Sequence, residues 1–146
     1  SGRFNMAILS RSVVTVSRSA TVLDAIHAMA GAKVGSVVVA DDGILEGIFS
    51  ERDVMLRMVV EGRDPRTTLV EEVMTSPVQT IQKRTTGDEA LRIMVQNHIR
   101  HLPVVDEKGH IQAMVSMRFL LEEKILELAQ QLDSLESYIT ADGIGG

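Results

Sequence analysis

The chain of 146 residues contains no cysteine and no tryptophan, and aromatic residues make up only 3% of it. Without cysteine there is no disulfide framework, no thiolate zinc site and no thiol nucleophile. No apolar run approaches the roughly 18 residues that a membrane-spanning helix needs, and we expect no signal peptide. These absences predict a soluble, cytoplasmic protein whose core is built from aliphatic side chains and methionine.

The charge and the histidine content argue against nucleic-acid binding, metal binding and catalysis. The net charge of −5 argues against a nucleic-acid binder, which usually carries a basic face. The four histidines do not have the spacing of a metal site. A Ser50–His101–Asp53 triad can be drawn on paper, but Ser50 and Asp53 lie within one helical turn, and no nucleophile elbow surrounds them. We therefore predict a protein that is not an enzyme, with no catalytic residue and no metal.

The sequence repeats one phrase. GIFSERDV at residues 47–54 returns as AMVSMRFL at residues 113–120. The two copies align over most of the chain, with Val39 matching Val104 at an offset of 65 residues. The acidic turn that follows is one residue longer in the second copy, so the offset then becomes 66. Such an internal repeat indicates two copies of one supersecondary unit.

Each copy predicts the element order β-α-β-β-α. The first helix of each copy begins at a threonine followed three residues later by an acid, Thr21–Asp24 and Thr86–Glu89, which is the capping-box pattern. A copy of about 55 to 60 residues is marginal alone, so we expect the two to pack through apolar sheet faces. The predicted strands are 13–16, 36–40 and 45–49 in the first copy and 78–81, 102–105 and 111–115 in the second, with closing helices from 51 and 117.

These elements predict an α+β (α/β-type) fold in which two tandem repeats pack with pseudo-twofold symmetry. We place the first repeat at residues 8–62, a turn-rich linker at 63–77 and the second repeat at 78–125. A long C-terminal amphipathic helix is expected at 117–139, followed by a flexible tail at 140–146.

The C-terminal helix carries apolar residues that step by 4, 3, 4, 3 and 4, which is a heptad seam. The alternative is an amphipathic helix that packs back on its own domain. Because the pattern continues past the second repeat, contact with a second copy is the favoured interpretation. The seam consists of Leu121, Ile125, Leu128, Leu132, Leu135 and Ile139.

The repeated stretches VVTV…GSVVVADDG…GIFSERDV and VMTSPVQTI…IRHLPVVDEKG…AMVSMRFL together resemble a tandem pair of cystathionine-β-synthase (CBS) domains, a Bateman module. The resemblance covers roughly residues 8–125. It implies a stand-alone regulatory or sensor module that binds AMP, ADP, ATP or NAD(H) between its repeats and signals by conformational or oligomeric change. It also implies a homodimer and an unidentified regulated protein. The alternatives are a structural dimerisation module with a decayed ligand site and an S-adenosylmethionine sensor.

Ser50 and Asp53 carry the chemistry of the repeated phrase. Ser50 stands where a strand ends and a helix begins, a corner whose free amides and dipole favour anions. Asp53 faces the same side, and a carboxylate can accept two hydrogen bonds from a ribose diol. The alternative is a plain N-cap followed by a first-turn acid. The resemblance implies that Asp53 clamps ribose and that Ser50 lies near the phosphate.

The resemblance also supplies the rest of this first site. The strand around Gln79 would flank the base, and apolar walls would enclose it. Arg100 and His101 would contact phosphate, since arginine suits bidentate oxyanion binding; the alternatives are a solvated Arg100 and a core-edge His101. His101 would add pH sensitivity if its pKa lies near neutrality. The predicted nucleotide-binding residues are Ser50, Arg52, Asp53, Val78, Gln79, Thr80, Ile48, Ile99, Arg100, His101 and Pro103.

The second copy of the phrase has Phe119 in place of the acid. A phenyl ring cannot accept a hydrogen bond from ribose, so we predict that the pseudo-twofold-related site is degenerate. It would be empty, filled by apolar packing, or used by a ligand that needs no ribose clamp. Its predicted lining is Val14, Thr15, Val16, Gly35, Ser36, Ser116, Met117 and Phe119. One competent nucleotide site per chain follows.

Overall fold

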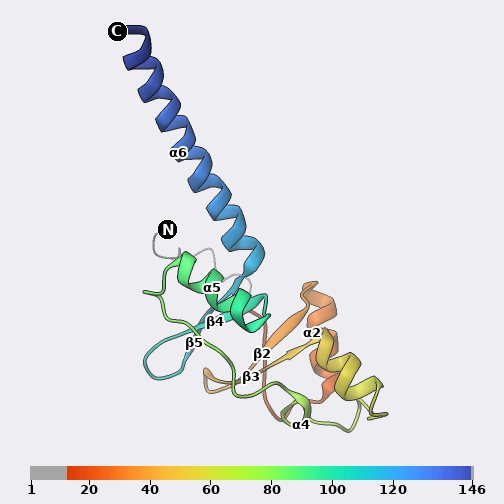
Figure 1. Ribbon diagram of the computed structural model, residues 1–146. Coiled ribbons are helices and arrows are strands. Elements are labelled where there is room, and N and C mark those ends of the chain that lie inside the picture. Colours follow the sequence, from red (N-terminus) through yellow and green to blue (C-terminus); the bar gives the residue numbers. More distant parts are fainter. Residues whose placement is uncertain (1–12, 146) are drawn as a thin grey trace.

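The computed structural model describes the backbone of residues 13–145 and the side chains of residues 13–140; the predicted start of the first repeat at residue 8 lies outside them. The predicted α+β fold is confirmed, with two small sheets, their helices and a long C-terminal helix (Figure 1). The first repeat contains β1 (Thr15–Val16), α2 (Val22–Ala32), β2 (Ser36–Asp41), β3 (Ile44–Ser50) and α3 (Glu51–Asp53), which continues as the π-helical η2 (Val54–Val59). The second repeat contains α5 (Gly87–Asn97), β4 (His101–Val105), β5 (Ile111–Ser116) and α6 (Met117–Gly145).

The helices α2 and α5 form by the same local rules. Thr21 accepts a hydrogen bond from the Asp24 amide at 3.1 Å. Thr86 accepts one from the Glu89 amide, and the Glu89 carboxylate accepts one from the Thr86 amide, each at 3.2 Å. Both threonines are therefore N-caps, and of the two, Thr86 also has the reciprocal bond of a capping box.

The strand predicted at 78–81 is reduced to one parallel bridge, between Ile81 and Val104. Its counterpart β1 pairs with β2 over two residues, and both hairpins are antiparallel as predicted. The segment that leads to Ile81 is held on the other sheet by Thr75, which exchanges backbone hydrogen bonds with Ile48 of β3 at 2.8 and 3.0 Å. Because this segment crosses from one sheet to the other, only its ends pair.

The predicted linker packs as part of the first repeat. It contains the short helix α4 (Val70–Val73), whose Val70 and Val73 side chains are buried in the first core. The Val70 amide donates to the Ala20 carbonyl at 2.9 Å, and the Val22 amide donates to Thr68 at 2.9 Å. Segment 63–77 is therefore not a free tether between the repeats.

The buried apolar side chains form three clusters. The core of the first repeat surrounds Phe49, and the core of the second surrounds Met94 and Leu102. Between the sheets lies a third cluster, which contains Val38, Ala40 and Met114 with Leu45, Ile48 and Ile111 beside them. The predicted packing through apolar sheet faces is thus present in the structure.

The two hairpin turns also bond to each other. The Ile111 amide donates to the Gly43 carbonyl at 2.8 Å, and the Leu45 amide donates to Gly109 at 3.0 Å. Gly43 and Gly109 have φ of 78° and 87°, a conformation that costs glycine little because it has no Cβ. These turns fix the repeats to each other at one end of their interface.

Helix α6 projects away from both sheets over most of its 29 residues (Figure 1). It runs to Gly145, past the end expected at residue 139 and through most of the tail expected to be flexible. Once a helix is nucleated, each added residue contributes one more backbone hydrogen bond, which favours this extension. Within residues 13–145, no helix has the length and apolar character needed to cross a bilayer.

Candidate functional site

Asp53 lies at the corner between β3 and α3 with only 7% of its surface exposed. Its Oδ2 accepts hydrogen bonds from the Ser50 amide at 3.0 Å and from Ser50 Oγ at 3.2 Å. Its Oδ1 accepts one from Thr75 Oγ1 at 3.2 Å and lies 3.6 Å from Arg57 Nε. Ser50 Oγ in turn accepts a bond from the Asp53 amide at 3.3 Å. The corner is thus a complete capping box reinforced from the linker by Thr75.

These contacts occupy most of the acceptor capacity of Asp53, because a carboxylate offers about four lone-pair positions. The N-cap interpretation of Ser50 and Asp53 describes their local contacts. A ribose diol could reach this carboxylate only by replacing one of its present donors, of which the Thr75 hydroxyl comes from a different segment.

The other residues predicted for the first site differ in their packing and exposure. Ile48 packs between the repeats, and Ile99 packs against the second core. Pro103 is fully buried in β4, while Thr80 lines a surface depression with Arg84. Val78 is half-buried, whereas Arg52, Gln79 and Arg100 are exposed. The structure therefore brings Ser50 and Asp53 together but joins them to Thr75 and Arg57.

A cavity of about 400 Å³ opens on the pseudo-twofold-related side, between the repeats. Five of the eight residues predicted for the degenerate site line it, and His101, predicted for the first site, lines it too. Thr15 instead pairs with Val38, Val16 packs on the first core and Met117 packs on the second. The full lining is Val14, Lys33, Val34, Gly35, Ser36, Val38, His101, Met114, Ser116, Arg118 and Phe119.

The walls of this cavity are apolar with hydroxyls among them. Phe119 supplies an aromatic side chain, and planar bases stack well on such rings. Ser116 Oγ accepts a hydrogen bond from the Phe119 amide at 3.1 Å, so this serine caps α6 as Ser50 caps α3. Ser36 supplies a second hydroxyl from the other repeat. The cavity therefore has the apolar and hydroxyl groups that a nucleoside needs.

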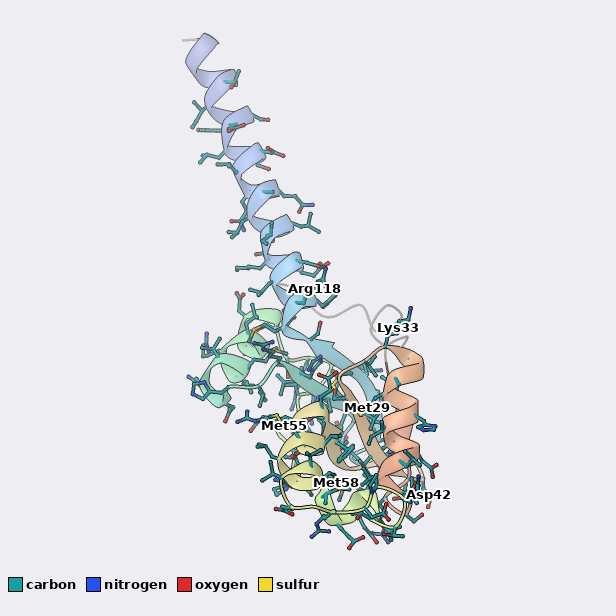
Figure 2. All side chains as sticks on the ribbon, turned by 90° about the vertical axis from the view of Figure 1, so that its right-hand side faces the viewer. Met29, Lys33, Asp42, Met55, Met58 and Arg118 are labelled. Carbon is teal, nitrogen blue, oxygen red and sulfur yellow. The ribbon has the colours of Figure 1, made fainter. Side chains whose placement is uncertain are left out.

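Two cations at this cavity were missed by the sequence reasoning. Lys33 ends α2 and Arg118 lies in the first turn of α6, both at the end of the body from which α6 leaves (Figure 2). The repeat contained the signal, because Arg118 is the counterpart of Arg52 in the Ser-x-Arg phrase. Lys33 is likewise the counterpart of His98, and both have a positive φ, 57° and 54°.

His101 does not add a third charge at neutral pH. Desolvation by the surrounding protein lowers its pKa from 6.5, and the charge of Arg100 lowers the pKa further. The ring is therefore neutral at pH 7 and can donate one hydrogen bond and accept another. Because the unfolded chain protonates this ring more readily, acidification through pH 6.5 reduces stability.

Comparison with known proteins now identifies the fold family. A sequence profile of the CBS domain matches residues 6–60 and 70–123. This chain belongs to the CBS-domain family. The CBS domain-containing protein CBSX3 of Arabidopsis thaliana is 36% identical over 124 residues, covering 82% of this chain and 60% of that protein. The solved structure of a putative signal-transduction protein with CBS domains from Burkholderia ambifaria has 33% identity and a TM-score of 0.73, covering 80% of this chain and 85% of that one.

Another CBS structure shows a bound nucleotide. The cytosolic domain of the Mg²⁺ channel MgtE was solved in complex with ATP, and it matches with 28% identity and a TM-score of 0.67 over 78% of this chain and 46% of that one. CBS pairs are generally regulatory modules that bind adenosine ligands, and stand-alone CBS proteins are typically not enzymes. The chain spans about 60% of the length of the Arabidopsis relative.

Proposed function

We propose that this CBS pair is a sensor that binds AMP, ADP, ATP or NAD(H) in the cavity between its repeats. The observation that carries the proposal is the combined lining of that cavity of about 400 Å³, a size within the usual range for small-molecule sites. Phe119 and Val14 would contact the base, Ser36 and Ser116 the sugar, and Lys33 and Arg118 the phosphates. Each repeat would supply one group of each kind, so a ligand bound in the cavity would contact both repeats.

A ligand that touches both repeats favours one relative arrangement of them. The proposed output is a change in the oligomer or in the binding of a regulated protein. Arg118 and Phe119 belong to the first turn of α6, so occupancy of the cavity would act directly on that helix.

The Ser50–Asp53 corner, the first site predicted from the sequence, remains a proposed ribose contact. It would be a second nucleotide site, related to the cavity by the pseudo-twofold symmetry. Its use requires the ribose hydroxyls to replace donors such as Thr75 Oγ1, which lies 3.2 Å from Asp53. We therefore propose that this second site is weaker than the cavity.

The test is calorimetric titration of the purified chain with AMP, ATP, NAD and S-adenosylmethionine after removal of any co-purified ligand. We expect saturation at one adenosine nucleotide per chain. Exclusive binding of S-adenosylmethionine would favour the S-adenosylmethionine sensor instead. If none of the four ligands binds, the proposal is contradicted and a structural dimerisation module is favoured.

Replacing Asp53 separates its two proposed roles. Asp53→Ala should lower the free energy of unfolding by about 0.5–2 kcal/mol, because the capping box is broken and the half-buried Ser50 and the exposed Thr75 lose their shared acceptor. If Asp53 also clamps ribose, nucleotide affinity at that site should fall at least about tenfold. Chemical denaturation measures the first effect and calorimetry the second.

Asp53→Asn is the matched control, because its amide keeps the shape and one acceptor oxygen of the aspartate. It should recover part of the lost stability. Reduced stability in Asp53→Ala with unchanged binding of every nucleotide would restrict Asp53 to the capping role.

A further inference from the structure

Helix α6 exposes a continuous apolar side that the body does not cover. The side chains involved are the α6 seam, meaning the six residues of the heptad pattern. Each keeps about half or more of its surface exposed: Leu121 47%, Ile125 65%, Leu128 52%, Leu132 56%, Leu135 53% and Ile139 58%. Six large apolar side chains in one row on a projecting helix form an interaction surface.

The second repeat packs against a different side of α6 from the one that carries the seam. Leu120 is buried in the second core, and Lys124 Nζ lies 3.2 Å from Asp88 Oδ1 of α5. If the α6 seam is assigned to heptad positions a and d, Leu120 falls at position c and Lys124 at position g, outside the seam. Packing back on the chain's own domain therefore accounts for the first turns of α6 only and leaves the seam available.

We infer that the α6 seam pairs with the same seam of a second copy in a parallel, two-stranded coiled coil. The steps of 4 and 3 put Ile125, Leu132 and Ile139 at a, and Leu121, Leu128 and Leu135 at d. Isoleucine at a with leucine at d favours two parallel strands. Two of the three a positions and all three d positions follow that rule.

The flanking charges also favour the parallel arrangement. In a fully overlapping antiparallel pair, the e positions of the two helices face each other, which sets Glu122 against Glu136 of the other copy twice. In a parallel pair each g position faces an e position of the next heptad, so Lys124 faces Ala129 and Gln131 faces Glu136. The parallel pair therefore contains no like-charged contact between e and g positions.

The seam is short, and this limits its strength. Six aliphatic side chains on each helix would bury on the order of 1,000 Å² in total, which is the low end for a specific interface. We therefore expect a reversible dimer with a dissociation constant in the micromolar range rather than a permanent one. The inference does not depend on nucleotide binding.

The first experiment is sedimentation velocity on the full chain without ligand over a concentration series. The unmodified chain should shift from monomer to dimer at about micromolar concentration, and Leu132→Asp should weaken that association at least about a hundredfold because each dimer loses two buried leucines. Gln130→Asp is the matched control, since it adds the same charge at the exposed f position. A monomer at every concentration, or equal effects of the two variants, would overturn the inference.

The second experiment fixes the orientation and uses the absence of cysteine from the chain. Ile125→Cys and Leu135→Cys are oxidised separately and as a mixture. A parallel pair brings each position next to its own copy, so each variant alone should form a disulfide dimer. An antiparallel pair brings residue 125 next to residue 135, so cross-linking confined to the mixture would overturn the inferred orientation. Unchanged thermal unfolding of the reduced variants confirms that the body is intact.

Discussion

Reversing the charges of Lys33 and Arg118 together should lower the affinity for ATP at least about a hundredfold. Each side chain is proposed to make a charge-assisted hydrogen bond to phosphate, worth about 1.5–3 kcal/mol, and the Lys33→Glu/Arg118→Glu variant adds repulsion to the loss of both. Adenosine has no phosphate, so its affinity should change little. Calorimetric titration with ATP and with adenosine measures the two effects on the same protein.

The matched control is Lys83→Glu/Arg84→Glu, which changes the net charge equally at exposed positions beside other depressions. An equal loss of ATP affinity in this control would mean that the net charge of the chain, and not contacts made by Lys33 and Arg118, lowers the affinity. Folding should be little affected, because the ion pair that Arg118 gives up with Glu122 is exposed. Unchanged ATP affinity in the Lys33→Glu/Arg118→Glu variant would show that these two side chains do not contact the phosphates of ATP.

Replacing Phe49 by alanine should lower the free energy of unfolding by about 3–5 kcal/mol. Phe49 is 0% exposed in β3 and packs in the core of the first repeat. Such a loss is a large part of the roughly 5–15 kcal/mol that stabilises an ordinary domain. The denaturant midpoint measures it, and an unchanged slope would show that the surface exposed on unfolding is the same.

Phe119→Ala is an informative comparison, because it removes the same side chain from a half-buried position in the cavity wall. It should cost less stability than Phe49→Ala and more nucleotide affinity. The opposite order of stability losses would contradict the described core.

Local signals in the sequence predicted most of the fold. The capping threonines Thr21 and Thr86 start their helices because the cap and the helix are adjacent in the chain. Because the two copies align, each helix or strand predicted in one copy supported the corresponding element in the other. The strand at 78–81 failed because pairing depends on where the segment travels, and Thr75 holds its start on the other sheet.

The candidate site was harder to predict, because it depends on how the two repeats face each other. The acid of the repeated phrase directed attention to Asp53, yet its Oδ1 is engaged by Thr75, 22 residues away in the chain. Phe119 was predicted to line a degenerate site without a ribose clamp, and it does line the cavity between the repeats. Composition and spacing do not show which donors a carboxylate such as Asp53 already accepts hydrogen bonds from.

The absence of any loop between β5 and α6 makes α6 a lever arm. Ser116 ends the strand and Met117 begins the helix, so the rod is joined rigidly to the sheet beside the cavity. A helix of 29 residues is about 43 Å long, and a tilt of about 5° at its base moves the far end by about 4 Å. A small shift around Phe119 that tilted the base of α6 by this angle would therefore move the far end of the helix by several ångströms, and a longer helix would move its end further.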